Sequence, residues 1–241
     1  MKERISFTRN RSSVKIHAQP DDSSCGPTCL HAIYRFYKDS IALDRVIREV
    51  KTLEGGGTLA VFLGCHALKR GYRATIYTLN LHVFDPTWFE KTKDFMVERL
   101  KLRSLAKKDP KLSAAVEGYV EFLENGGEIR FRDMSNTIIR KYLDKNIPVI
   151  SGLSSTFLYR AMREVGETNS EDDVAGDPAG HFVVLVRYDR VKKRILLADP
   201  YEANPLNKEH YYYIGSGRLI NSILLGIVTY DSNLLIIEPG N

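Results

Sequence analysis

The sequence contains little cysteine: three residues, Cys25, Cys29 and Cys65, in a chain of 241. An odd and sparse set of thiols argues against a disulfide framework and favours a reducing compartment such as the cytoplasm. The thiols also lack the paired Cys-x-x-Cys spacing of a structural zinc site, so we expect neither a metal nor another cofactor. Each thiol is left with two possible roles, chemistry or packing in the core.

Long apolar runs are also absent. Residues 1–15 are charged and contain no stretch of the kind found in a secretory signal. The longest apolar segment, residues 219–228, falls short of the roughly 18 residues that a membrane helix needs. The net charge of +5 comes from basic residues interleaved with acids, so we expect neither a membrane nor a nucleic acid as partner.

The order of the expected elements indicates one α+β domain spanning residues 1–241. Helical patterns occupy most of the first 146 residues, at 25–37, 43–53, 58–70, 86–108, 112–125, 135–146 and later at 218–225. Strand patterns lie mainly in the later part, at 72–79, 147–153, 182–188, 195–198 and 234–238. Helices first and strands later favour α+β over alternating βαβ units. Residues 164–180, rich in acids and turn formers, predict a mobile loop.

Cys25 stands where the first helix is expected to begin. The free backbone N–H groups and the positive dipole end of a helix stabilise a thiolate at that position. Gly26 then allows another chain to approach the sulfur closely. This pattern is typical of a cysteine nucleophile, and the alternative is a small buried hydrophobic residue.

His181 and Asp199 are the candidates for the base and for the group that orients it. His181 opens an apolar strand, and Asp199 ends the next strand just before Pro200. With residues 189–191 as the hairpin loop, counting outward places His181 opposite Asp199, with Cβ atoms about 4.5–5.5 Å apart. A slip of one residue would place the two side chains on opposite faces instead.

Gln19 lies six residues before Cys25 in a turn-like segment. Its side-chain amide can join the backbone N–H of Cys25 in binding a developing oxyanion. A solvated loop glutamine is the alternative. We further expect His17, on an extended segment before the nucleophile, and Gly26 and Gly180 to line the substrate side.

Several short motifs resemble those of a known family, the bacteriocin-leader or double-glycine peptidases among the papain-like cysteine peptidases. The motifs are QPDDSSCGPTCL at 19–30, GTL at 57–59 with ALKRGY at 67–72, HFVVL at 181–185 and ADP at 198–200. They are similar to the family's nucleophile segment, its next helix, its histidine strand and its Asp-Pro motif. The resemblance covers about residues 15–80 and 147–201.

The resemblance implies a papain-like fold, with a helical N-terminal half packed on an antiparallel sheet from the C-terminal half. It also implies that Cys25 is the nucleophile, His181 the base and acid, Asp199 the orienting group and Gln19 the oxyanion donor. Residues 81–146 look like a helical insertion. Because no phosphate-binding loop or membrane helix follows, we expect a stand-alone enzyme rather than the peptidase end of an exporter.

The leading hypothesis is therefore a cysteine peptidase that hydrolyses peptide or amide bonds through a Cys25 thioester. Two alternatives remain open: an acyl- or peptidyl-transferase of the same fold that uses an amine acceptor, and an inactive module that only binds peptides. The acidic residues 164–177 are either a lid or selector for basic substrates, or a solvated surface loop.

Overall fold

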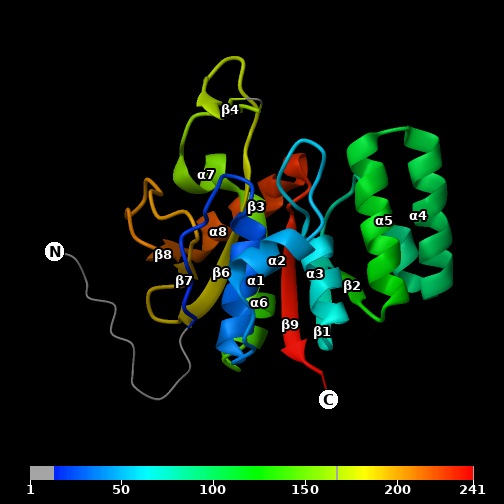
Figure 1. Cartoon of the computed structure of the whole chain (residues 1–241), viewed down its shortest axis with the longest axis horizontal. Helices are drawn as coiled ribbons and strands as arrows, with labels where there is room; N and C mark the ends of the chain where they lie inside the picture. The colour runs from blue at the N-terminus through cyan, green and yellow to red at the C-terminus, as the bar shows by residue number, and fades with distance from the viewer. Residues whose placement is uncertain (1–13, 167, 241) are drawn as a thin grey trace.

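A computed structural model describes residues 14–166 and 168–240 of the chain. Its centre is a seven-stranded sheet with the strand order β2-β1-β9-β3-β6-β7-β8, which runs through the middle of the molecule (Figure 1). The strands are β1 (Tyr72–Thr78), β2 (Glu128–Phe131), β3 (Val149–Ser154), β6 (Gly180–Asp189), β7 (Arg194–Ala198), β8 (Tyr211–Gly215) and β9 (Asn233–Pro239). Within this described sheet β1 and β2 are parallel, and the other neighbours are antiparallel.

Helices cover both faces of the sheet. They are α1 (Cys25–Phe36), α2 (Leu43–Glu49), α3 (Ala60–Lys69), η1 (Pro86–Glu90), α4 (Lys93–Lys107), α5 (Pro110–Glu124), α6 (Asn136–Leu143), α7 (Ser155–Tyr159), α8 (Ser216–Leu225) and η2 (Gly226–Thr229). Figure 1 shows α1 and α3 in front of the sheet and the α4–α5 hairpin at its side. This architecture confirms the expected α+β class.

The apolar strand β6 shows how the two layers share the sheet. Phe182 and Val184 belong to the core with α1, α3 and α5, whereas Val183 and Leu185 belong to the core with α6 and α8. Successive strand residues point to opposite faces, so a continuous apolar run is buried on both sides. The strand therefore ties the helical N-terminal half to the rest of the molecule.

Helix α1 packs against β6 through a residue without a side chain. A Cβ atom on Gly26 would lie 2.6 Å from Thr58 Cγ2 and 3.2 Å from Phe182 Cδ2. Leu30 and Ile33, further along the helix, are buried in the same core. These buried side chains and the close contact at Gly26 together place Cys25, the first residue of α1, near the N-terminal end of β6.

The expected helical insertion at residues 81–146 is helical only in part. Its first half forms η1, α4 and α5, but residues 128–131 form strand β2, which pairs in parallel with β1. Helix α6 packs on the opposite face of the sheet from α5. A four-residue edge strand directly after the helix-terminating Gly126 and Gly127 carries too little periodicity to be identified in the sequence.

Two further elements also differ from expectation. The loop predicted at 164–180 contains a small hairpin, β4 (Glu164–Val165) with β5 (Ser170–Glu171). Helix α7 was not predicted, because five residues are too few to show a helical period; the Ser154 side chain accepts a hydrogen bond from Phe157 N at its start, 3.3 Å long. Among the helices that the structure describes, none has the length and apolarity required to cross a bilayer.

Candidate active site

Cys25 is the first residue of α1, as expected. No side chain caps this end of the helix, so its backbone N–H groups remain available near the sulfur. The preceding loop is ordered by Asp21, whose Oδ1 accepts from Ser23 N at 2.9 Å and whose carbonyl accepts from Ser24 Oγ at 3.1 Å. Cys25 itself is only 8% exposed.

His181 and Asp199 meet in a buried pair. His181 Nε2 lies 2.9 Å from Asp199 Oδ1, and their residues are 7% and 0% exposed. The other carboxylate oxygen accepts hydrogen bonds from the hydroxyls of Tyr159 at 2.7 Å and Tyr212 at 2.5 Å. Tyr201 N–H donates to Oδ1 at 2.9 Å. Both oxygens of the buried carboxylate are thus satisfied, as burial of a charge requires.

The strand register behind this contact differs from the expected one. The hairpin loop is longer than three residues, because Asp189 pairs with Arg194, and β6 carries a bulge. Continuing the pairing places Asp199 opposite Val183, two residues along β6 from His181. The expected direct opposition is therefore wrong. The side chains still meet, because a shift of two residues keeps them on one face as diagonal neighbours.

The electrostatics of the site favour an imidazolium. Burial acts to lower the pKa of His181, but the charge and hydrogen bond of Asp199, with the hydrogen bond and charge of Cys25, raise it to about 10. Burial opposes ionisation of Asp199 as well, yet His181 and the two tyrosine hydroxyls lower its pKa. Since Nε2 is bonded to Asp199, Nδ1 is the ring nitrogen left for the Cys25 side chain.

Gln19 lies between the nucleophile loop and the Asp-Pro motif. Its backbone N–H donates to the carbonyl of Pro200 at 3.0 Å. Its side-chain Nε2 donates to the carbonyl of Asp21 at 2.9 Å, which leaves the second N–H of that amide for another acceptor. The structure thus brings the Gln19 segment beside the Asp199 end of the site.

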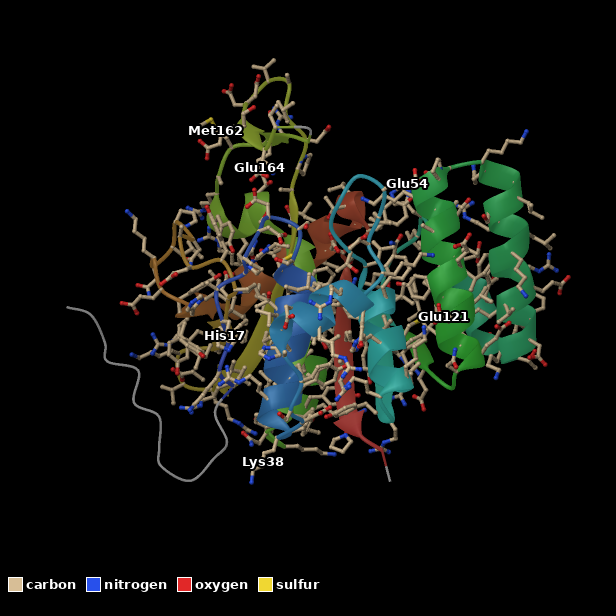
Figure 2. The ribbon with its side chains drawn as sticks, viewed as in Figure 1. His17, Lys38, Glu54, Glu121, Met162 and Glu164 are labelled. Carbon is tan, nitrogen blue, oxygen red and sulfur yellow. The ribbon has the colours of Figure 1, made fainter. Side chains whose placement is uncertain are left out.

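His17 is not brought to this group. Its Nε2 lies 2.5 Å from Arg35 Nη1, and its ring centroid lies 5.4 Å from that of His31. Arg35 is ten residues beyond Cys25, about 15 Å along the helix axis. Figure 2 shows His17 beside the lower half of α1, so the structure places it away from the candidate nucleophile.

The two glycines expected on the substrate side have different positions. Gly26 is buried against Thr58 and Phe182, so the atoms that approach it closely belong to this chain's own core. Gly180 is exposed and directly precedes His181. Only Gly180 therefore lies on an accessible surface of the site.

The other two cysteines are part of the packing. Cys29 is fully buried, its Sγ lies 3.3 Å from the carbonyl oxygen of Phe182, and burial raises its pKa well above the usual range. Burial also raises the pKa of Cys65, to about 12. Neither thiol is suited to form a thiolate. Within the described residues, no three His, Cys, Asp or Glu side chains are grouped to hold a metal ion.

The tyrosines that support Asp199 escaped the sequence analysis. Tyr212 belongs to a run of three tyrosines at residues 211–213, and alternation along β8 turns this one inward. Tyr159 lies on the short helix α7, whose five residues are too few to show a helical period. The one sequence feature that could have indicated this hydrogen-bond support of Asp199 is Tyr212, the middle residue of the tyrosine run.

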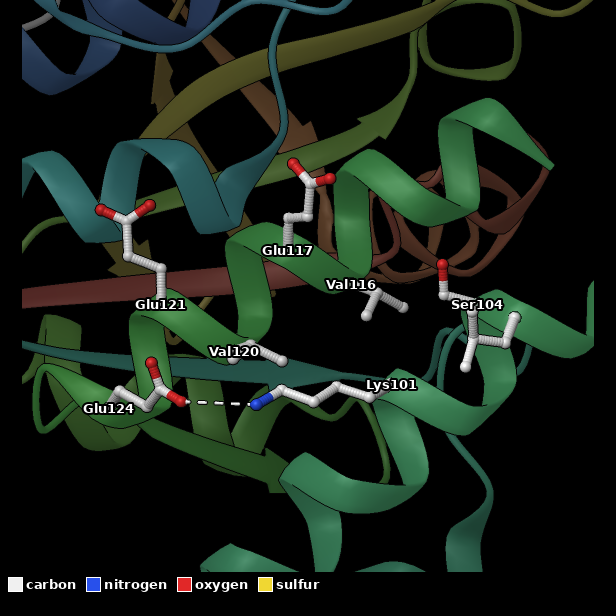
Figure 3. Close-up of a pocket in the computed structure, with 8 residues that line it drawn as sticks. Lys101, Ser104, Val116, Glu117, Val120, Glu121 and Glu124 are labelled. Carbon is white, nitrogen blue, oxygen red and sulfur yellow. Dashed lines mark ion pairs between the residues drawn. The ribbon is translucent and has the colours of Figure 1, made fainter. Parts of the chain in front are cut away.

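A pocket elsewhere in the molecule lies between α4 and α5 (Figure 3). Its lining comes from these two helices alone: Lys101, Ser104, Leu105, Val116, Glu117, Val120, Glu121 and Glu124. Lys101 Nζ and Glu124 Oε1 are 3.8 Å apart across it. None of the candidate catalytic residues contributes to this pocket.

Comparison with known proteins agrees with the family resemblance. The model of the Peptidase_C39 like family matches residues 111–218, a span that contains His181 and Asp199 and begins after Cys25. No curated protein matches the sequence.

Several solved structures are similar to this chain over most of its length. A Bacillus anthracis protein described as a C39-like peptidase matches with a TM-score of 0.51 and 14% identity, over 94% of each chain. The peptidase domain of Streptococcus ComA, a bifunctional ABC transporter, matches with a TM-score of 0.46 and 13% identity, over 94% of this chain and 98% of that one. A double-glycine-motif protease from an AMS/PCAT transporter, solved with its leader peptide, matches with a TM-score of 0.45 and 16% identity, over 96% of each chain.

These comparisons confirm the resemblance to the double-glycine peptidase-like family and the papain-like fold. The family match and the shared fold support a cysteine peptidase at the level of class. The residues that carry out the reaction must be argued from this chain's own geometry.

Proposed function

We propose that the protein is a cysteine peptidase that hydrolyses a peptide bond through a thioester on Cys25. One observation carries the proposal: the buried imidazole of His181 bonds to Asp199 at 2.9 Å, and the Cys25 side chain is close enough to help raise the pKa of the same ring. Nucleophile, base and orienting group in this order are the arrangement that covalent acyl transfer requires.

Each residue has a defined part in the proposed reaction. The thiolate of Cys25 bonds to the peptide carbonyl carbon, and an electron pair moves to the carbonyl oxygen. The Cys25 N–H and the second N–H of the Gln19 amide stabilise that oxyanion. His181 gives its proton to the leaving nitrogen as the C–N bond breaks, which leaves a thioester and a neutral imidazole.

Water completes the cycle. Neutral His181 takes a proton from the attacking water, whose oxygen bonds to the thioester carbon, and the thiolate of Cys25 departs. The imidazolium is thereby restored. Asp199, held by Tyr159 and Tyr212, keeps the ring oriented and stabilises its charge in both halves of the cycle.

Replacement of the nucleophile tests this proposal. In Cys25→Ala, cleavage of a mixed peptide library followed by mass spectrometry should fall to background, while circular dichroism and the melting temperature stay close to the wild-type values. Cys65→Ala is the matched control, because it removes another buried thiol from a helix; it should keep its turnover and lose only about 1–2 kcal/mol of stability. Cleavage by Cys25→Ala would refute the proposal.

The products distinguish hydrolysis from transfer. Hydrolysis adds one water across each cleaved bond, whereas an amine acceptor would remain attached to the acyl fragment. Product masses measured with and without added peptide amines therefore show which acceptor the thioester uses. We expect the free acid to be the main product.

A further inference from the structure

A buried carboxyl group that the proposed reaction does not use lies beside the strand of His181. Asp231, between η2 and β9, is 6% exposed, and its Oδ1 has no hydrogen-bond partner among the described residues. Its Oδ2 packs so closely against Gly180 that a Cβ atom on that residue would overlap it. Because Gly180 is exposed and directly precedes His181, the carboxyl group lies just beneath an accessible part of the site.

The two residues that follow Asp231 in the chain also carry unpaired oxygens. Ser232 Oγ and Asn233 Oδ1 are also buried without a partner. A Cβ on Gly152 would lie 3.0 Å from that Asn233 oxygen and 2.6 Å from the backbone oxygen of Asp231, so the glycine makes room for both. A buried acceptor left without a donor destabilises the folded protein. The unpaired Oδ1 of Asp231, close to the exposed Gly180, therefore suits a ligand that brings N–H donors.

The charges nearby leave this carboxyl group largely uncompensated. Burial raises the pKa of Asp231 to about 7, although a Thr229 hydrogen bond and the charges of Lys111 and His181 act in the opposite direction. On the facing helix α5, burial and the nearby Asp231 raise the pKa of Tyr119.

A second acid interacts electrostatically with the same histidine. Glu164 of β4 lies on the segment that rises above β3 (Figure 2). Burial, with the neighbouring charges of Asp22 and Glu171, raises its pKa, and His181 partly opposes that rise. Two acids beyond Asp199, Asp231 and Glu164, therefore interact with His181, and an acidic environment favours a cationic ligand.

We propose that Asp231 determines specificity by binding a positively charged side chain of the peptide substrate where the substrate passes Gly180. A guanidinium or ammonium group supplies N–H donors to Oδ1, the atom that has none, and neutralises a carboxylate that burial otherwise disfavours. The inference rests on the proposed peptidase function and gives it a substrate class: peptides with a basic residue close to the scissile bond.

A matched pair of substrates isolates the effect of the charge. Quenched fluorescent peptides carry arginine or its neutral isostere citrulline at each of the four positions on either side of a cleaved bond. For the wild type we expect one position at which arginine raises kcat/KM about ten- to a hundredfold over citrulline, the range for a charge-assisted hydrogen bond. In Asp231→Asn that ratio should fall to about 1, whatever the absolute rate for the citrulline peptides.

Asp133→Asn is the control, because Asp133 is exposed after β2 and the substitution removes the same charge; it should keep the wild-type ratio. Cleavage without a preference for arginine at any position, or a preference that Asp231→Asn retains, would overturn the proposal. Absence of cleavage of every peptide, with Cys25 no more reactive than an ordinary thiol, would instead overturn the peptidase function itself.

The pH dependence of the wild type gives an independent test that needs no variant. Citrulline is neutral throughout, so any pH dependence of the bond cleavage itself affects both peptides alike and cancels in their ratio. The arginine preference should rise between about pH 6 and pH 8 as Asp231 ionises. A ratio that stays flat over this range would contradict the assignment.

Discussion

At the scale of single residues, the site depends on how Asp199 is kept ionised within the protein. Two tyrosine hydroxyls, one backbone N–H and His181 all donate to its two oxygens. A fully satisfied carboxylate is a fixed negative charge, and a fixed charge beside an imidazole stabilises the protonated ring. The acid strength of His181 is therefore set by this surrounding network as well as by the pair alone.

Asp199→Asn tests this dependence. Since Asp199, together with Cys25 and against the effect of burial, raises the pKa of His181 to about 10, the protonated ring that serves as the acid is present below that pH and lost above it. Without the carboxylate the pKa falls, so the alkaline limb of the kcat/KM profile should move down by at least about one pH unit. The rate at neutral pH should fall about a hundredfold, in the range of lost acid–base catalysis.

The profile is measured for Asp199→Asn, the wild type and Asp133→Asn, which should behave as the wild type does. An unchanged alkaline limb in Asp199→Asn would show that another group controls the protonation of His181.

At the scale of elements, the close packing of α1 on β6 fixes the distance between sulfur and imidazole. Gly26, the second residue of α1, has no room for a side chain against Thr58 and Phe182. Because Phe182 follows His181 directly, any movement of α1 at this contact changes the position of Cys25 relative to the ring.

Gly26→Ala should therefore affect the rate more than a surface change would. A methyl group 2.6 Å from Thr58 Cγ2 forces the start of α1 outward, and overpacking of this kind costs about 1–3 kcal/mol of stability. We expect kcat to fall at least about tenfold, because small displacements of a reacting atom strongly reduce catalysis.

Gly55→Ala is the matched control, since a Cβ atom there meets nothing within 4 Å. It should keep both its activity and its melting temperature. Wild-type kcat in a folded Gly26→Ala variant would mean that the contact does not position Cys25.

The strands and helices with strong periodicity could be predicted from the sequence, and the short ones could not. The helix at Cys25, the central strands and the final strand all carry long apolar patterns. Strand β2 and helix α7 are too short for that signal, and tertiary packing decides them. The register between β6 and β7 also escaped prediction, because a bulge and the length of a turn are set by local backbone geometry.

At the scale of the whole molecule, the candidate site joins segments that are far apart in the sequence. Cys25 comes from the first helix, and His181 and Asp199 come from strands more than 150 residues later. The sequence predicted these three residues and Gln19, but it misplaced His17. It gave no sign of Tyr159, and it did not indicate Asp231, because only the folded chain brings that carboxyl group beside Gly180.

The central claim is that His181 and Asp199 activate the Cys25 sulfur, and the rate of its alkylation tests this claim most directly. Iodoacetamide is added at pH 6, where an ordinary thiol of pKa about 8.5 is almost entirely protonated, and modification of each cysteine is followed by peptide mass spectrometry. The account predicts that wild-type Cys25 reacts at least about tenfold faster than a model thiol, and that His181→Ala removes this advantage. Equal rates for wild-type Cys25, the His181→Ala variant and the model thiol would contradict it.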